Sequence, residues 1–207
     1  MKSALLLLLM IGFLFPKPAG RPGTQASPAY EEDCDDPDAA VSCCFRDMPA
    51  TLSAVMQIAG PSEAGERMSV RGTLYHRDGK TPYPGVVMYA YHTDNRGHYS
   101  KDGSEKGIQK WHGRLHGWCR TDSAGRYEIR SVRPAPYPGG RIPAHIHAAL
   151  LEPGKEPYYI SDFVFRDDPF VTPEYMASVK GSGGKGVVSL HRTAAGWKGQ
   201  RDIILEK

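Results

Sequence analysis

The sequence predicts an all-β protein, an Ig-like β-sandwich of about seven or eight short strands with one or two short helices. The 207 residues include 23 glycines and 17 prolines, which leave few uninterrupted stretches long enough for helices. Short runs of strand-forming residues bounded by turn signals recur along the chain instead. Hydrophobic residues make up 40% and charged residues 24% of the chain, a composition that excludes wholesale disorder, collagen and coiled coil.

The strand pattern occupies the part of the chain after residue 66. Residues 122–125 (Asp-Ser-Ala-Gly) lie between two predicted strands and have the composition of a hairpin loop. Thr172, Pro173 and Glu174 supply an N-cap, a first-turn proline and a first-turn acid, which predict a short helix over residues 173–180. The predicted strands span residues 69–75, 85–92, 118–121, 126–132, 144–151, 158–165, 187–191 and 201–205.

The chain divides into three segments. Residues 1–26 have the layout of a secretory signal peptide: Lys2, an apolar run over residues 4–15, and a polar Pro/Gly-rich stretch with Gly20 or the region of Ala26 as cleavage site. The apolar run is too short to span a bilayer, so we expect an exported protein, periplasmic or secreted, without a stable membrane anchor. Residues 27–66 form an acidic, cysteine-containing arm with a short helix within residues 48–58, and residues 67–207 form the sandwich.

Charge and cysteine content narrow the function classes. Six acidic residues fall within positions 30–38, and the rest of the chain carries a mild, scattered positive excess, which does not indicate a nucleic-acid partner. In an oxidising compartment Cys34, Cys43, Cys44 and Cys119 would form two disulfides. A bond between adjacent Cys43 and Cys44 would be strained, so Cys34 is expected to pair with one of them and Cys119 with the other. A thiolate metal site lacks the paired Cys-x-x-Cys spacing.

Histidines and tyrosines form a candidate site. His145 and His147 stand two apart in a predicted strand, so both side chains project from one face and can bind one ion. Tyr137 lies in a proline-restricted segment shortly before them, and Tyr99 lies in the turn region after the strand that ends near His92. Loops at one end of a rigid sandwich are a natural place for a site.

Three segments together resemble the intradiol ring-cleavage dioxygenases, the protocatechuate and catechol dioxygenases. They are Trp-Cys-Arg-Thr-Asp-Ser-Ala-Gly-Arg-Tyr at residues 118–127, Pro-Ala-Pro-Tyr-Pro at 134–138 and Pro-Ala-His-Ile-His at 143–147. Residues 85–99 also resemble the family's first ligand segment, which ends in Gly-x-Tyr. The resemblance covers about residues 68–165 and implies an intradiol dioxygenase-type β-sandwich as the catalytic domain.

The resemblance implies that Tyr99, Tyr137, His145 and His147 bind a mononuclear ferric ion, with Tyr137 and His147 axial. A free tyrosine has a pKa of about 10, and Fe(III) is a Lewis acid strong enough to hold two phenolates. The implied activity is cleavage of a small aromatic diol with O2 to a cis,cis-muconate-type diacid, and Tyr137 would act as general base. Arg141 would stabilise charge on the ring carbon, although Ile142 separates it from Pro143; Arg133 is the fallback.

Other interpretations stay open. The chain could be a catalytically inactive secreted sandwich that binds a partner through its acidic arm, or the same site could hold zinc or copper. Tyr158 and Tyr159 could line a substrate pocket or serve packing. The sequence leaves a homo-oligomer open. Five of the other histidines are expected not to be ligands: His92, His98, His112, His116 and His191.

Overall fold

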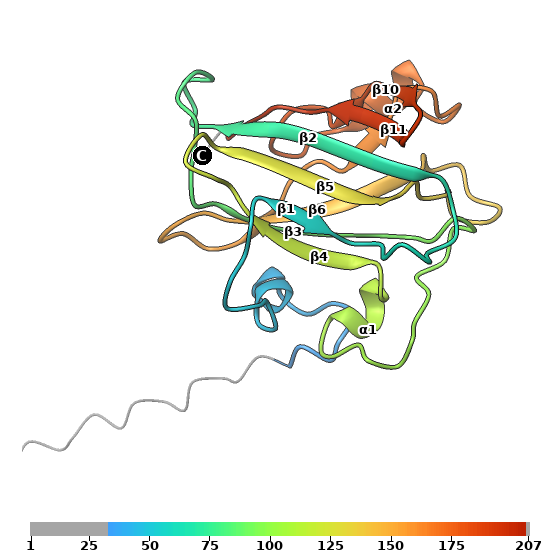
Figure 1. Ribbon diagram of the computed structural model, residues 1–207, viewed down its shortest axis with the longest axis horizontal. Coiled ribbons are helices and arrows are strands. Elements are labelled where there is room, and N and C mark those ends of the chain that lie inside the picture. The colour runs from blue at the N-terminus through green and yellow to red at the C-terminus, as the bar shows by residue number, and fades with distance from the viewer. Residues whose placement is uncertain (1–32, 206–207) are drawn as a thin grey trace, which may run out of the picture. The chain divides into compact units, whose positions relative to one another are not determined.

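The computed structural model describes residues 33–205 and confirms an all-β sandwich of two six-stranded sheets (Figure 1). The first sheet runs β1 (Val55–Gln57), β5 (Arg126–Val132), β2 (Arg67–Tyr75), β11 (Gly196–Gln200) and β10 (Leu190–Thr193), with β12 (Ile203–Ile204) also on β2. The second runs β4 (His116–Arg120), β3 (Val87–His92), β6 (His145–Leu151), β8 (Phe163–Phe165) and β9 (Val187–Val188), with β7 (Tyr158–Tyr159) on β6. The helices are η1 (Val41–Phe45), α1 (Gln109–His112) and α2 (Pro173–Ser178).

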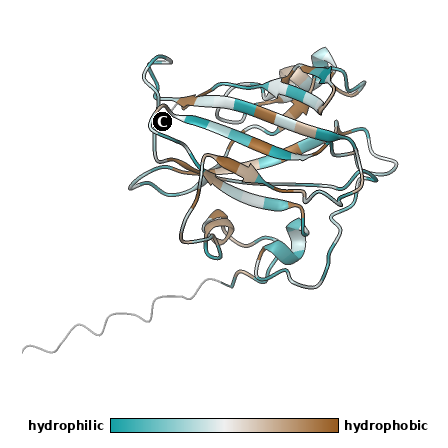
Figure 2. Cartoon of the chain, viewed as in Figure 1, coloured by the Kyte–Doolittle hydropathy of each residue, from teal (hydrophilic) through white to brown (hydrophobic). Residues whose placement is uncertain are grey.

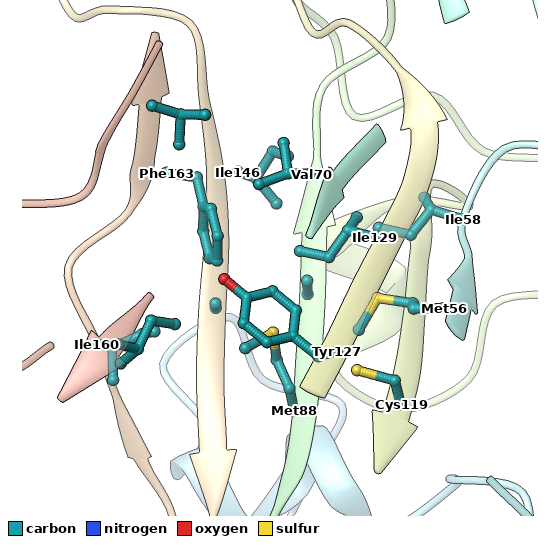
Figure 3. Close-up of a cluster of buried hydrophobic side chains, with 14 of the residues drawn as sticks. Met56, Ile58, Val70, Met88, Cys119, Tyr127, Ile129, Ile146, Ile160 and Phe163 are labelled. Carbon is teal, nitrogen blue, oxygen red and sulfur yellow. The ribbon is translucent and has the colours of Figure 1, made fainter. Parts of the chain in front are cut away.

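The core lies between the two sheets and follows from the two-residue period of the strands. In β2 every second residue is buried (Met68, Val70, Gly72 and Leu74), the residues that alternate with them are more exposed, and Figure 2 shows this alternation along the strand. Figure 3 shows side chains from both sheets meeting, among them Ile129 from β5 and Phe163 from β8. Fully burying such a side chain contributes about 1.5–3 kcal/mol.

The outer face of the second sheet is partly covered as well. β3 is buried at every position, because its outward residues Val87, Tyr89 and Tyr91 pack beneath the segment that contains η1. On the neighbouring strand β6, Ile146 faces the core, and His145 and His147 therefore face outward. The register pairs His147 directly with Tyr91. This outer face, where aromatic packing gives way to solvent, is where the two histidines project.

Most predicted strands form, and the structure shows why some divide. Residues 126–132 form β5 with the expected bounds, and four other strands match with small shifts at their ends. The segment 187–191 splits into β9 and β10, since β9 pairs with β8 in the second sheet and β10 with β11 in the first. The segment 158–165 divides into β7 and β8. The segment 201–205 contains the short strand β12, and β11 lies immediately before this segment. Helix α2 begins at Pro173, with Thr172 Oγ1 accepting from the Tyr175 N–H at 3.2 Å, and ends two residues earlier than predicted.

Two local predictions are wrong. Residues 48–58 do not form a helix: Val55–Gln57 is strand β1, which pairs in parallel with β5 and buries Met56. Residues 122–125 do form a tight turn, in which Asp122 Oδ1 accepts from the N–H groups of Ala124 and Arg126, but the turn does not close a hairpin. β4 pairs with β3 and β5 with β2, so this turn carries the chain from one sheet to the other.

The cysteines form one disulfide rather than the two expected. Cys34 is bonded to Cys43, whereas Cys44 and Cys119 are free and buried. Cys119 lies in the core between the sheets and Cys44 lies in the cluster on the outer face, so the second sheet separates the two thiols. The predicted signal peptide lies outside the described residues. In the part of the chain that the structure describes, no helix is long and apolar enough to cross a membrane.

Candidate metal centre

The structure brings together the four predicted side chains on the outer face of the second sheet. Tyr99 comes from the loop after β3, Tyr137 from the loop between β5 and β6, and both histidines from β6. We call these four residues the tyrosine–histidine cluster. Its polar atoms form a closed ring: Tyr99 Oη to Tyr137 Oη 2.5 Å, Tyr137 Oη to His145 Nε2 3.3 Å, His145 Nε2 to His147 Nε2 3.0 Å, and His147 Nε2 to Tyr99 Oη 3.1 Å.

Both imidazoles present the same nitrogen to the centre of this ring. His145 Nδ1 lies 2.7 Å from the Pro143 carbonyl, and His147 Nδ1 lies 2.9 Å from Asp162 Oδ1. A carbonyl and a carboxylate accept hydrogen bonds, so each Nδ1 carries the proton and each Nε2 keeps a free lone pair. Burial lowers the pKa of His145, which favours its neutral form. Two lone pairs that face each other at 3.0 Å fit a cation between them.

The phenols fit the same cation. Burial, together with the neighbouring Tyr137 hydroxyl, raises the pKa of Tyr99 well above its usual value. A strong Lewis acid is therefore needed to hold this oxygen as a phenolate at neutral pH. Ligands that share an ion at about 2 Å lie roughly 3–4 Å apart. Three of the four ring distances are 3.0–3.3 Å, and the two phenol oxygens are closer because they share a hydrogen bond.

Asp94 joins the two loops that carry the tyrosines. Its Oδ1 accepts from the N–H groups of Arg96 and His98 at 2.8 and 3.1 Å, and its Oδ2 accepts from Ser100 Oγ at 2.7 Å. Its backbone carbonyl accepts from the Ala135 N–H in the Tyr137 loop at 3.0 Å. Burial alone would raise the pKa of Asp94, but these hydrogen bonds lower it to about 2. The loop that ends at Tyr99 is thereby tied to the loop that carries Tyr137.

The two loops approach so closely that one position requires glycine. Gly97 has φ 84°, and a Cβ atom there would lie 2.1 Å from the Pro136 carbonyl oxygen. Tyr91 forms the wall beneath the site: its ring stacks on His147 with centroids 4.7 Å apart and on His112 at 3.6 Å. The cluster thus stands on packed aromatic rings and on a strand of the second sheet.

Sequence reasoning did not single out Asp162. It joins His145 and His147 in the one group of His, Cys, Asp and Glu side chains within residues 33–205 whose ligand atoms lie close enough to hold a metal, all within 4.8 Å. Asp162 precedes β8, and the register pairs the next residue, Phe163, with Ile146. Asp162 therefore falls beside His147 only once the pairing of β6 with β8 is known.

The arginine candidates lie in different surroundings. Arg141 is exposed, in the loop between Tyr137 and His145. Arg133, the fallback, binds both carboxylate oxygens of Asp167 at 2.8 and 2.9 Å and lies over the rings of Phe165 and Trp197. Its guanidinium group is occupied by this ion pair, which leaves Arg141 as the arginine beside the cluster in sequence.

Several of the other tyrosines and histidines contact neighbouring side chains. Tyr158 donates to the buried carboxylate of Glu152 at 2.8 Å, and Tyr159 Oη lies 3.6 Å from Cys44 Sγ. Among the histidines predicted not to be ligands, His92 contacts Ser131 Oγ at 2.7 Å and His112 contacts Tyr89 Oη at 2.9 Å. None of the five belongs to the metal-ligand group found within residues 33–205.

Comparison with known proteins decides the family. The family model described as "Dioxygenase" matches residues 45–193, most of the chain. This chain belongs to the intradiol ring-cleavage dioxygenase family. Chlorocatechol 1,2-dioxygenase of Rhodococcus opacus is 30% identical over 135 residues, and catechol 1,2-dioxygenase 2 of Acinetobacter lwoffii is 27% identical over 157. The matches cover 57% and 56% of this dioxygenase-family chain but only 51% and 55% of those relatives, so the chain spans about half their length.

Solved structures support the fold of this dioxygenase-family chain. The dioxygenase domain of a dioxygenase and carbohydrate-binding protein fusion from Streptomyces sp. SirexAA-E superposes with a TM-score of 0.58 at 21% identity, covering 78% of this chain and 90% of that one. An intradiol ring-cleavage dioxygenase from Tetranychus urticae superposes with a TM-score of 0.53 at 18% identity, covering 72% of this chain and 84% of that one. The sandwich described above is thus the fold of other dioxygenases.

Proposed function

We propose that this chain is a non-haem Fe(III) intradiol dioxygenase that cleaves a catechol-type ring between its two hydroxylated carbons, with both atoms of O2 entering a cis,cis-muconate-type diacid. The observation that carries this proposal is the tyrosine–histidine cluster, whose two phenol oxygens and two imidazole nitrogens close a ring with sides of 2.5–3.3 Å. Membership of the intradiol family supports the reaction class.

Ferric iron is the ion that this set of ligands favours. Two hard phenolate oxygens stabilise a trivalent ion, and no thiolate belongs to the metal-ligand group found within residues 33–205. When bound, Fe(III) supplies Lewis acidity that withdraws electron density from a chelated diol and makes its ring reactive toward dioxygen. A ferrous site of His145, His147 and Asp162 is disfavoured, because Asp162 binds the Nδ1 side of His147, away from the two Nε2 atoms.

The protein residues supply proton transfer and orientation. Tyr137 Oη, at a corner of the ring beside Tyr99 Oη and His145 Nε2, is suited to take the proton that a diol hydroxyl loses on binding. Arg141 is the candidate to stabilise negative charge on the substrate ring, a role supported by its position in the loop between Tyr137 and His145. The stacked Tyr91 ring fixes the plane of His147 and with it one wall of the site.

The test is to reconstitute the purified protein with Fe(III) and record its visible spectrum and its O2 uptake with catechol, protocatechuate and hydroxyquinol. We expect a tyrosinate-to-iron absorption band and O2 uptake equal to the diol consumed. A protein that stays colourless with Fe(III) would favour zinc or copper in the same site. A coloured protein without O2 uptake would favour the catalytically inactive binding protein.

Export is a further part of the proposal. The Cys34–Cys43 disulfide supports it, since such bonds persist in oxidising compartments. The expected result is that material recovered outside the cytoplasm begins after the apolar run of residues 4–15, as N-terminal sequencing would show. Retention of the whole leader in a cytoplasmic protein would contradict export and leave the proposed reaction unaffected.

A further inference from the structure

Asp162 stands behind the tyrosine–histidine cluster rather than within its ring. Its Oδ1 lies 2.9 Å from His147 Nδ1, on the opposite side of the imidazole from the nitrogen that faces the ring. The Asp162 side chain is 33% and the His147 side chain 23% exposed, so solvent screens this pair only in part. The contact joins two segments 15 residues apart in the chain.

The two histidines of the cluster are held by different partners. His145 donates its Nδ1 proton to a backbone carbonyl, that of Pro143, which no substitution can remove. His147 donates to a carboxylate side chain, and a hydrogen bond to a charged acceptor is roughly twice as strong as a neutral one. Because the Nδ1 partner decides which ring nitrogen carries the proton, His147 depends on Asp162 for the free lone pair on its Nε2.

The backbone around Asp162 is fixed before any ligand arrives. The Ser161 N–H donates to the Ser182 carbonyl at 2.9 Å, and the Ser161 carbonyl accepts from the buried Arg201 guanidinium at 2.9 Å. On the other side, Gly186 approaches so closely that a Cβ atom there would lie 1.8 Å from the Asp162 carbonyl oxygen. A carboxylate held on a rigid backbone can orient its partner, whereas one on a free loop cannot.

We propose that Asp162 is the positioning residue of the metal centre: it holds His147 in the tautomer and orientation that direct Nε2 at the ion. The stacked Tyr91 ring fixes the plane of the imidazole, and Asp162 fixes its rotation within that plane and its proton. Loss of the carboxylate frees the proton to move to Nε2, where it blocks the lone pair. Removing such a partner typically weakens metal binding about 10–100-fold.

The experiment compares Asp162→Ala and Asp162→Asn with the wild-type protein, first without metal. Nitrogen NMR of ¹⁵N-histidine-labelled protein reports which ring nitrogen of His147 carries the proton. We expect the Nδ1–H form in the wild type, a shift toward the Nε2–H form in Asp162→Ala, and substantial retention in Asp162→Asn, whose amide oxygen can still accept. His145 is the internal control, because its carbonyl partner is unchanged in both variants.

The second measurement is Fe(III) affinity, from competition with a chelator, together with the position of the tyrosinate-to-iron band. Asp162→Ala should bind Fe(III) about 10–100-fold more weakly than the wild type, and Asp162→Asn should recover part of that loss. Asp167→Ala removes a neighbouring carboxylate that pairs with Arg133 instead of a histidine, and should match the wild type.

The inference rests on the proposed function for the iron measurement only. An unchanged His147 tautomer in Asp162→Ala, or an unchanged Fe(III) affinity in a folded variant, would overturn it. If the wild type itself binds no Fe(III), the proposed function fails while the NMR result still decides whether Asp162 positions His147. If Asp162→Ala unfolds, Asp162→Asn carries the test through its Fe(III) affinity, and an affinity equal to that of the wild type would count against the inference.

Discussion

Tyr137 stands where the phenolic and imidazole halves of the cluster meet, and its substitution gives the most direct test of the proton transfer. Tyr137→Phe removes Oη and keeps the ring that packs at 85° against His145, with centroids 5.2 Å apart. We expect the rate of ring cleavage to fall about 10²–10⁴-fold, the usual contribution of a general base, with little change in thermal stability. The measurements are O2 uptake by the iron-loaded variant and its melting temperature. Tyr75→Phe is the matched control, and a full rate in Tyr137→Phe would assign the proton transfer to another group.

A buried histidine outside the cluster contributes to the loss of stability at acid pH. His92 is fully buried, its Nδ1–H donates to the Thr93 carbonyl at 2.6 Å, and burial lowers its pKa to about 4. The unfolded chain takes up a proton at His92 near pH 6.5, while the folded protein does not. The contribution of the neutral, buried His92 to stability is therefore complete above pH 6.5 and is lost as the pH falls toward 4. His92 contributes at most about 1.4 kcal/mol per pH unit to the slope, and His112, whose pKa burial lowers to about 3, contributes in the same direction.

Urea unfolding of the metal-free protein between pH 7 and 5 measures this slope. His92→Gln removes one titrating group and should make the dependence of stability on pH less steep over the same range. A wild-type stability that stays constant from pH 7 to 5 would show that His92 titrates alike in both states.

At the scale of single residues, the sequence could predict the four members of the cluster but not their supports. The pairing of the two histidines follows from the two-residue period of a strand, whereas Tyr99 and Tyr137 follow from the resemblance of their segments to the intradiol dioxygenases. Asp94 and Asp162 contact the site through a loop connection and a strand register, neither of which a linear pattern encodes. The cluster residues could be predicted from local segments of the sequence. Asp94 and Asp162 could be identified only once the neighbouring strands and loops were known.

At the scale of elements, the two tyrosine loops behave as one unit because Asp94 accepts hydrogen bonds within one and from the other. Asp94→Ala leaves three donors without their partner in a buried position, which should lower the free energy of unfolding by about 2–3 kcal/mol. Faster hydrogen exchange at the backbone N–H groups of Arg96 and His98 would show that the loop has loosened. Asp102→Ala, which removes an exposed loop carboxylate bonded to Ser104, should change stability by less than about 0.5 kcal/mol. Equal effects of the two substitutions would contradict the role given to Asp94.

Two of the errors at this scale share one cause. A turn signal such as that at residues 122–125 encodes a change of chain direction, and the sequence does not state whether the next strand joins the same sheet. The strand at 187–191 divides for the same reason, since its two halves belong to different sheets. Strand existence follows from local composition, whereas sheet membership follows from packing across the whole domain.

At the scale of the whole molecule, the two sheets are joined by a buried arginine close to the candidate metal centre. Arg201 lies between β11 and β12 of the first sheet, is 6% exposed, and donates to the carbonyls of Ser161 and Gly183 at 2.9 and 3.1 Å. Its guanidinium lies 4.2 Å from the ring centre of Phe163 in β8, and its own carbonyl accepts from Tyr127 Oη at 2.7 Å. The residue that holds Ser161 therefore also holds the backbone that leads into Asp162.

Replacing Arg201 should therefore weaken both the fold and the site. Arg201→Ala leaves two buried carbonyls without donors and a space beside Phe163. We expect the free energy of unfolding to fall by about 2–4 kcal/mol and the melting temperature to fall by about 4–16 °C. Because Asp162 would lose its rigid backbone, Fe(III) affinity in the folded fraction should also fall. Calorimetry and chelator competition measure the two effects, and Lys198→Ala, at an exposed position of β11, should leave both near wild type. A destabilised Arg201→Ala protein that binds Fe(III) with unchanged affinity would show that the centre is supported by the second sheet alone.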